Sequence, residues 1–60
     1  MDLTERQTQI VKLVAEGLVN KEIAFRLGIE ERTVKNHLHE IFEKVGCNTR
    51  TQLAMKYVRG

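Results

Sequence analysis

The fold of this chain is decided by residues 20–46, NKEIAFRLGIEERTVKNHLHEIFEKVG. The apolar residues of its first part share one face of a helix, at Ile23, Ala24 and Leu27. They end at Gly28, a residue type suited to the left-handed cap of a helix C-terminus. We expect a helix of about two turns over residues 21–27, with Asn20 as its N-cap. Phe25 lies off this face, and we expect it to pack across a helix end, with contact to a further domain as the alternative.

The second part of the stretch has the pattern of a longer amphipathic helix over residues 31–45. Its apolar residues follow at intervals of four, three and four, at Val34, Leu38, Ile41 and Val45. The opposite face collects mostly hydrogen-bonding side chains, those of Arg32, Lys35, Asn36, His39 and Glu43. A short helix, a tight turn and a longer helix with a polar outer face form a helix-turn-helix, whose second helix can lie in the DNA major groove. The small side chain of Ala24 favours the close helix crossing that this arrangement needs.

Two further helices flank this motif, over residues 5–16 and 50–58. Each begins with a capping-box pattern, at Thr4 and Gln7 and at Thr49 and Gln52. The flanking helices add apolar residues to the expected core: Ile10, Val11, Leu13, Val14, Leu53, Ala54 and Tyr57. The sequence therefore predicts an all-α fold in which residues 1–60 form a single four-helix domain, with a helix-turn-helix and an extra C-terminal helix.

Composition excludes several classes of function. The chain has 60 residues, 42% of them hydrophobic, with no proline and a single cysteine, Cys47. So short a chain can hardly surround a substrate pocket and keep its own core, which argues against an enzyme and against a small-molecule ligand. One cysteine forms no internal disulfide, and the first residues lack the basic and apolar regions of a signal peptide. No apolar run approaches the length of a membrane span, so we expect a cytoplasmic protein without membrane contact.

We expect neither a metal nor another cofactor. His37 and His39 stand two residues apart on the expected third helix, so their side chains point in different directions. One cysteine and two histidines also fall short of a zinc site. No nucleophile stands beside a base in the pattern of a catalytic site. The sequence therefore favours binding over catalysis.

Four separated blocks of sequence carry a closer resemblance. They read LTxR at residues 3–6, GLxNKEIA at residues 17–24, TVKxHLxxIxxKVG at residues 33–46 and TRxxLA at residues 49–54. In this order and register they resemble the LuxR-type helix-turn-helix domain of bacterial transcription regulators, over nearly the whole chain. The chain departs from the family pattern at Gln7, where Glu is usual, at Val19, where a small polar residue is common, and at Glu30, where Ser or Thr usually caps the third helix.

The resemblance implies sequence-specific binding of double-stranded DNA for transcription regulation, with the third helix, residues 31–45, in the major groove. The family positions that touch base edges are matched by Lys35, Asn36 and His39, with Arg32 as a fourth candidate. These side chains suit the role, since lysine can donate to guanine acceptors and asparagine can form two hydrogen bonds with adenine. Contacts with phosphates fall to a second set, which is Asn20, Lys21, Thr33, His37 and Lys44.

The fourth helix carries a second, smaller apolar stripe, at Thr51, Met55 and Val58. The resemblance implies that two copies meet through this helix on DNA, so we expect a homodimer on an inverted-repeat site. The alternative is that these are ordinary exposed apolar residues. Bound near a promoter, such a protein would help or hinder RNA polymerase, which is a further candidate partner.

Two other functions remain open at this point. Region four of sigma factors has a similar Leu-Thr start and Glu-Ile-Ala segment, and it works inside the polymerase holoenzyme. A protein-interaction module with the same fold is favoured by charge, because residues 29–45 hold three basic and four acidic side chains, a net charge of −1. The basic excess lies in residues 46–60, where Arg50, Lys56 and Arg59 have no acidic counterpart. The sequence fits either a free-standing protein or an excised domain.

Overall fold

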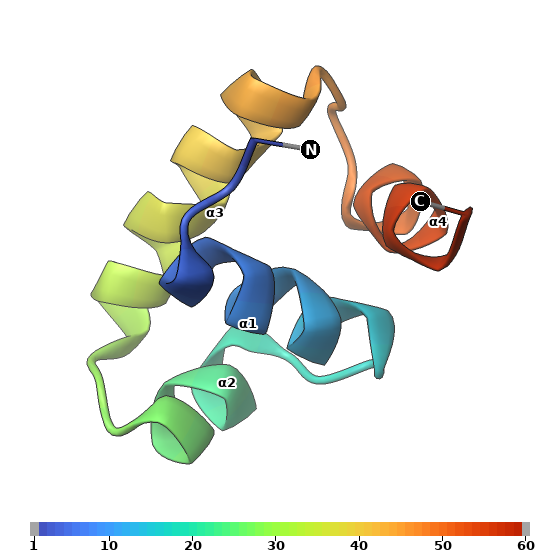
Figure 1. The fold of residues 1–60 in the computed structure, drawn as a ribbon. Helices are drawn as coiled ribbons and strands as arrows, with labels where there is room; N and C mark the ends of the chain where they lie inside the picture. The colour runs from blue at the N-terminus through green and yellow to red at the C-terminus, as the bar shows by residue number, and fades with distance from the viewer. Residues whose placement is uncertain (1, 60) are drawn as a thin grey trace.

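The computed structural model describes residues 2–59, and within them it contains four α-helices and no strand. The helices are α1 (Glu5–Ala15), α2 (Asn20–Leu27), α3 (Glu31–Val45) and α4 (Arg50–Arg59), shown in Figure 1. Each lies within one residue of its predicted position at both ends, so the predicted all-α, four-helix fold is confirmed. None of these helices is both long and apolar enough to cross a membrane.

The start of α1 is held by the predicted capping box. The Thr4 hydroxyl oxygen accepts from the backbone N–H of Gln7 at 3.1 Å, and the Gln7 side-chain oxygen accepts from the backbone N–H of Thr4 at 3.0 Å. Only half of the second predicted box forms. The Thr49 hydroxyl oxygen accepts from the Gln52 N–H, but the Gln52 side chain reaches back to the N–H of Asn48, one residue before the cap. Both arrangements satisfy N–H groups that a helix start leaves without partners.

The predicted role of Asn20 as N-cap of α2 is wrong. Val19 occupies the cap position with an extended backbone, and Asn20 is already the first helical residue. Because valine has no side-chain acceptor, the Glu22 carboxylate reaches back instead and accepts from the Val19 backbone N–H at 2.9 Å. The Asn20 side chain is thereby left for another partner. At the other end of α2, Gly28 adopts the left-handed conformation, φ +69°, as predicted.

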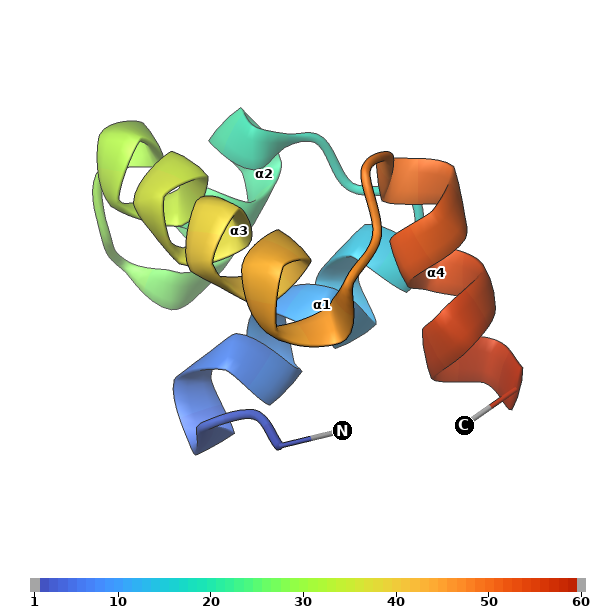
Figure 2. The ribbon, with the colours of Figure 1, turned by 90° about the horizontal axis from the view of Figure 1, so that it is seen from above.

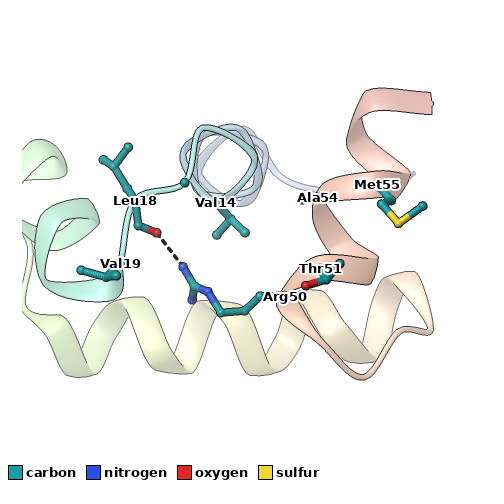
Figure 3. A pocket seen from close by; sticks show the side chains of 8 residues that line it. Val14, Leu18, Val19, Arg50, Thr51, Ala54 and Met55 are labelled. Atoms are coloured by element: carbon teal, nitrogen blue, oxygen red, sulfur yellow. Dashed lines mark hydrogen bonds between the residues drawn. The ribbon is translucent and has the colours of Figure 1, made fainter.

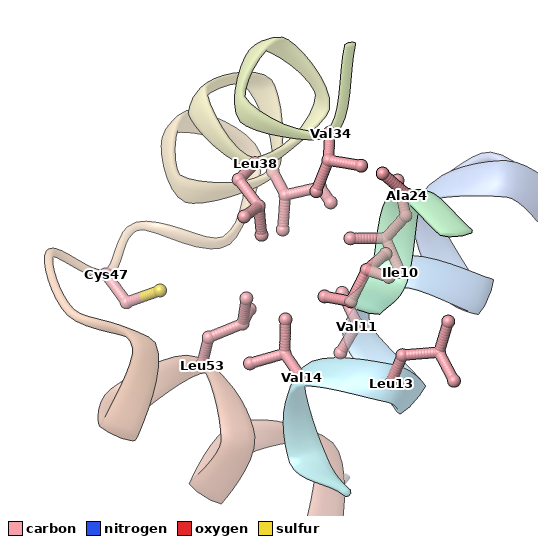
Figure 4. Close-up of a cluster of buried hydrophobic side chains, with 11 residues drawn as sticks. Ile10, Val11, Leu13, Val14, Ala24, Val34, Leu38, Cys47 and Leu53 are labelled. Atoms are coloured by element: carbon pink, nitrogen blue, oxygen red, sulfur yellow. The ribbon is translucent and has the colours of Figure 1, made fainter. Parts of the chain in front are cut away.

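The core lies where α1 meets the other helices. The helix-turn-helix pair α2 and α3 packs together, α1 packs against both, and α4 packs on α1 (Figures 1 and 2). Figure 4 shows apolar side chains from all four helices directed into one cluster. Its members are Ile10, Val11, Leu13, Val14, Ile23, Ala24, Val34, Leu38, Ile41, Cys47 and Leu53. Leu27 and Val45, two predicted core residues, are partly buried at its margin.

Two aromatic side chains lie outside this core, against expectation. Phe25 is 90% exposed rather than packed across a helix end. Neighbouring helical residues point about 100° apart, so once Ile23 and Ala24 face inward, Phe25 turns toward solvent. Tyr57 is 36% exposed, because Leu53, one turn earlier, fills the contact of α4 with α1 and leaves the tyrosine at its margin. A phenol tolerates such a position, since its hydroxyl can stay in water.

These exposures predict effects of very different size for two substitutions on the short helix α2. Ile23→Ala removes a fully buried side chain and should lower the free energy of unfolding by about 2–5 kcal/mol. Phe25→Ala, two residues later, should change it by less than about 0.5 kcal/mol. Urea denaturation followed by circular dichroism measures both. A loss for Phe25→Ala comparable to that for Ile23→Ala would show that Phe25 packs in solution.

Candidate nucleic-acid interface

The outer face of α3 carries the predicted base-reading residues. The buried residues Val34, Leu38 and Ile41 form one side of the helix and direct the other side to solvent. On that side the whole predicted reading set is exposed: Arg32, Lys35, Asn36 and His39. The helix is fifteen residues long and stands at one edge of the molecule in Figure 1, so its outer face is unobstructed by the other described helices.

One of these residues already has a partner on the same helix. The Nε2 atom of His39 lies 2.8 Å from a carboxylate oxygen of Glu43, one turn further on, and both side chains are largely exposed. Exposed pairs of this kind contribute little to stability, because water competes for both groups. His39 can therefore exchange this carboxylate for another acceptor at small cost.

Two predicted phosphate-binding residues, Thr33 and His37, lie at the border between the buried and exposed sides of α3. Both side chains are half-buried. The Nδ1 atom of His37 is buried and has no hydrogen-bond partner within residues 2–59. A neutral imidazole carries its proton on one nitrogen only, and a buried N–H without an acceptor is costly. Nε2 is accordingly the ring nitrogen left to donate to a partner outside the core.

The beginning of α2 contains two more predicted phosphate-binding residues, Asn20 and Lys21. Lys21 is exposed, whereas Asn20 is half-buried and contacts α4. The Arg50 guanidinium donates to the Asn20 side-chain oxygen at 2.6 Å and to the backbone carbonyl of Leu18 at 2.7 Å. From the sequence, Arg50 was counted as part of the basic excess in residues 46–60, and this internal role was missed. No sequence signal pairs Arg50 with residues some thirty positions earlier, since only the packing of α4 on α1 brings them together.

The last predicted phosphate-binding residue, Lys44, is also tied to another helix. Its ammonium group donates to the Gln7 side-chain oxygen at 3.1 Å. Gln7 is only 4% exposed and is the buried polar residue among those described. The same oxygen accepts from the Thr4 backbone, so one glutamine both caps α1 and holds the side chain of Lys44. Because the amide is neutral, it orients the lysine without cancelling its charge.

An open hollow of about 340 Å³ brings residues from three helices together beside the outer face of α3. Its walls include two predicted base readers, one predicted phosphate contact and Arg50 of α4. The full lining is Asn20, Lys35, Leu38, His39, Phe42 and Arg50. Lys44 does not line it. Three of the nine predicted DNA contacts, Asn20, Lys35 and His39, therefore meet at this hollow, whereas the other six do not line it.

A second open hollow, of about 310 Å³, separates the turn after α1 from α4 (Figure 3). Thr51 and Met55 of the predicted dimer stripe line it on the α4 side, and Val19 lines it on the other. Met55 is 50% exposed and Val58 is 77% exposed. All three residues of the stripe, Thr51, Met55 and Val58, are therefore exposed to solvent.

The fold and the exposed face of α3 define a helix-turn-helix domain, and comparison with known proteins identifies its family. The family model described as bacterial regulatory proteins, luxR family, matches residues 1–57. The chain belongs to this family, whose members are DNA-binding transcription regulators and not enzymes. This assignment confirms the resemblance seen in the sequence and decides against sigma region four.

Full-length regulators are among the relatives. The chain is 50% identical over 50 residues to the transcriptional regulatory protein YdfI of Bacillus subtilis (strain 168), which is 83% of this chain and 24% of that protein. It is 48% identical over 59 residues to the transcriptional regulatory protein LnrK of the same organism, 98% of this chain and 27% of LnrK. It is 42% identical over 53 residues to the DNA-binding transcriptional activator DevR/DosR of Mycobacterium tuberculosis (strain ATCC 25618 / H37Rv), 88% of this chain and 24% of that protein. The chain thus spans about a quarter of the length of these relatives.

The double role of Gln7 predicts a loss of stability that a neighbouring glutamine should not show. Gln7→Ala removes the acceptor of both the Thr4 N–H and the Lys44 ammonium, and should lower the free energy of unfolding by about 1–2 kcal/mol. Gln9→Ala, on the exposed side of α1, should leave it within about 0.5 kcal/mol. Chemical denaturation of both variants provides the measurement. Equal effects would contradict a special role for Gln7.

Proposed function

We propose that this domain reads a specific sequence of double-stranded DNA by inserting α3 into the major groove. The observation that carries the proposal is the exposed strip of Lys35, Asn36 and His39, directly opposite the buried stripe of the same helix. Lysine donates to the acceptors of guanine, and asparagine pairs with adenine through two hydrogen bonds. Arg32 extends the strip toward the start of α3 and is a fourth candidate reader.

Contacts with the DNA backbone would hold the domain in place on either side of α3. At the start of α2, the Asn20 oxygen already accepts from Arg50, so its Nδ2 group is the part left to donate to a phosphate. Lys21 beside it is exposed. On α3, Thr33 and the Nε2–H of His37 can donate from the edge of the core. Lys44, held by Gln7, adds a positive charge near the end of the helix.

The charge distribution limits how α3 can approach DNA. Residues 29–45 have a net charge of −1, with acidic residues at the start of the segment, at Glu30 and Glu31, and near its end. Phosphates repel these carboxylates, so we propose that the middle of α3 lies deepest in the groove. Affinity then depends on few cationic contacts, and a single domain binds modestly and with strong dependence on salt. Such a regulator acts where the chromosome is, in the bacterial cytoplasm.

Two copies of the domain would pair through α4. Support comes from Thr51, Met55 and Val58, which are exposed on one helix that also packs on α1 through Leu53. A two-fold axis through α4 would present two α3 helices to successive half-sites, so the target would be an inverted repeat. Bound near a promoter, the dimer would help or hinder RNA polymerase.

Selection of bound sequences from a random duplex pool tests the proposal directly. The 60-residue chain is immobilised at near-physiological salt, with a low-salt selection as control. Enrichment of an inverted repeat supports a sequence-reading dimer. A lone half-site supports reading by α3 but contradicts pairing through α4. No enrichment at either salt, from a chain shown to be folded, contradicts sequence reading and favours a protein-interaction role.

Residues that contact bases and residues that contact phosphates should respond differently to truncation. Asn36→Ala should relax base preference at one position of the selected site, at a cost of about 1–3 kcal/mol for the preferred base. Lys21→Ala should weaken binding to all sequences by the same factor and reduce the salt dependence by about one counterion. Fluorescence anisotropy on the selected site and its single-base variants separates these outcomes. A uniform loss across all variants for Asn36→Ala would remove it from the reading set.

A charge placed on the α4 stripe should disrupt pairing and leave the fold intact. Met55→Glu puts a carboxylate at a half-exposed position and should weaken binding to the inverted repeat more than binding to a half-site. Gln52→Glu is the matched control, because it adds the same charge to an exposed position of α4 and keeps the acceptor for the Asn48 N–H. Stoichiometry on DNA is measured by analytical ultracentrifugation. Two bound copies with unchanged affinity for Met55→Glu would contradict the interface.

A further inference from the structure

Arg50, the first residue of α4, joins two groups that lie 32 and 30 residues earlier in the chain. One guanidinium nitrogen donates to the Leu18 carbonyl at 2.7 Å, in the turn after α1, and the other donates to Asn20 Oδ1 at 2.6 Å, at the start of α2. Figure 3 shows the arginine reaching from α4 to this turn. Two charge-assisted hydrogen bonds from a planar fork fix direction as well as distance.

This contact settles which way the Asn20 amide faces. A guanidinium can only donate, so the asparagine must turn its oxygen toward Arg50. Its NH₂ group then points away from the arginine. Asn20 also lines the hollow beside the outer face of α3, together with Lys35 and His39. Without Arg50, the amide could rotate by half a turn and present an oxygen, which a phosphate repels.

We propose that Arg50 is a positioning residue for DNA binding, which orients the Asn20 amide and holds the first turn of α2 so that Nδ2 donates to a backbone phosphate. The inference rests on the proposed DNA contact at the start of α2. It differs from a simple attraction between the arginine and DNA, because Arg50 acts through Asn20. Through this role, Arg50 would connect α4, the helix proposed to pair two copies, with the contact that Asn20 of the same copy makes with a DNA phosphate.

Three substitutions separate orientation from charge. Arg50→Lys keeps the positive charge but replaces the two-pronged donor by a single ammonium group, so it should lose the fixed amide. Asn20→Ala removes the amide altogether. Asn20→Asp keeps an oxygen for Arg50 and removes the NH₂ donor, so it should preserve the fold while abolishing the phosphate contact. The double variant Arg50→Lys with Asn20→Ala completes a double-mutant cycle.

Binding of each variant is measured on a labelled mixed-sequence duplex and on the selected site, at a temperature where circular dichroism shows every variant folded. We expect Arg50→Lys and Asn20→Ala each to weaken binding about tenfold, as for loss of one charge-assisted contact, by the same factor on both duplexes. Asn20→Asp should weaken binding by at least this factor, because its carboxylate also repels the phosphate. The double variant should bind no more weakly than Asn20→Ala alone. The Asn20 side-chain NH₂ resonances in nuclear magnetic resonance spectra should shift and broaden in Arg50→Lys.

Other outcomes overturn the inference in recognisable ways. If Arg50→Lys costs the same factor whether residue 20 is Asn or Ala, the arginine acts on its own charge or on the fold in general. If Asn20→Asp binds as tightly as the unchanged chain, no phosphate contacts the amide donor. If the unchanged chain binds neither duplex, the proposed function itself fails, and the positioning role fails with it. Binding by the unchanged chain without coupling overturns the positioning role alone.

Discussion

The packing of three helices on α1 is the constraint from which the rest of the molecule follows. Ile10 and Val11 are completely buried, and α1 contacts α2, α3 and α4. So small a domain buries a smaller share of its surface than a larger one, so it cannot spare an apolar contact. Because α3 must turn Val34, Leu38 and Ile41 toward α1 and α2, its other face is directed to solvent. The surface proposed to read DNA is thus a by-product of how the core is filled.

The fold could be predicted from the sequence because its signals are local. Apolar spacing located α3 to the residue, and the capping pattern of Thr4 and Gln7 located the start of α1. The errors arose where a choice depended on neighbours far away in the chain. Asn20 has the residue type of an N-cap. In the structure the Glu22 carboxylate accepts from the Val19 backbone N–H instead, and the Asn20 side-chain oxygen accepts from Arg50. Phe25 and Tyr57 were placed inward because hydrophobicity says nothing about which surfaces are already covered.

The candidate site was predictable in part. Exposure of Lys35, Asn36 and His39 follows from helical periodicity alone, and the structure confirms that exposure. Which bases or phosphates they touch depends on a partner molecule, so those roles stay predictions. The two polar contacts that organise the site, between Lys44 and Gln7 and between Arg50 and Asn20, could not be read from spacing. Both join residues at least thirty positions apart, so helical periodicity carries no signal for either contact.

The contact between Gln7 and Lys44 bears on how the domain responds to acid. A carboxylate in the place of this amide would form an ion pair with the lysine, and that pair would weaken as the carboxylate took up a proton. An amide has no proton to gain in that range of pH. The junction between the start of α1 and the end of α3 therefore keeps its hydrogen bonds when the surrounding solution is acidified. At this junction the chain forgoes an ion pair and has instead a hydrogen bond whose acceptor does not titrate in acid.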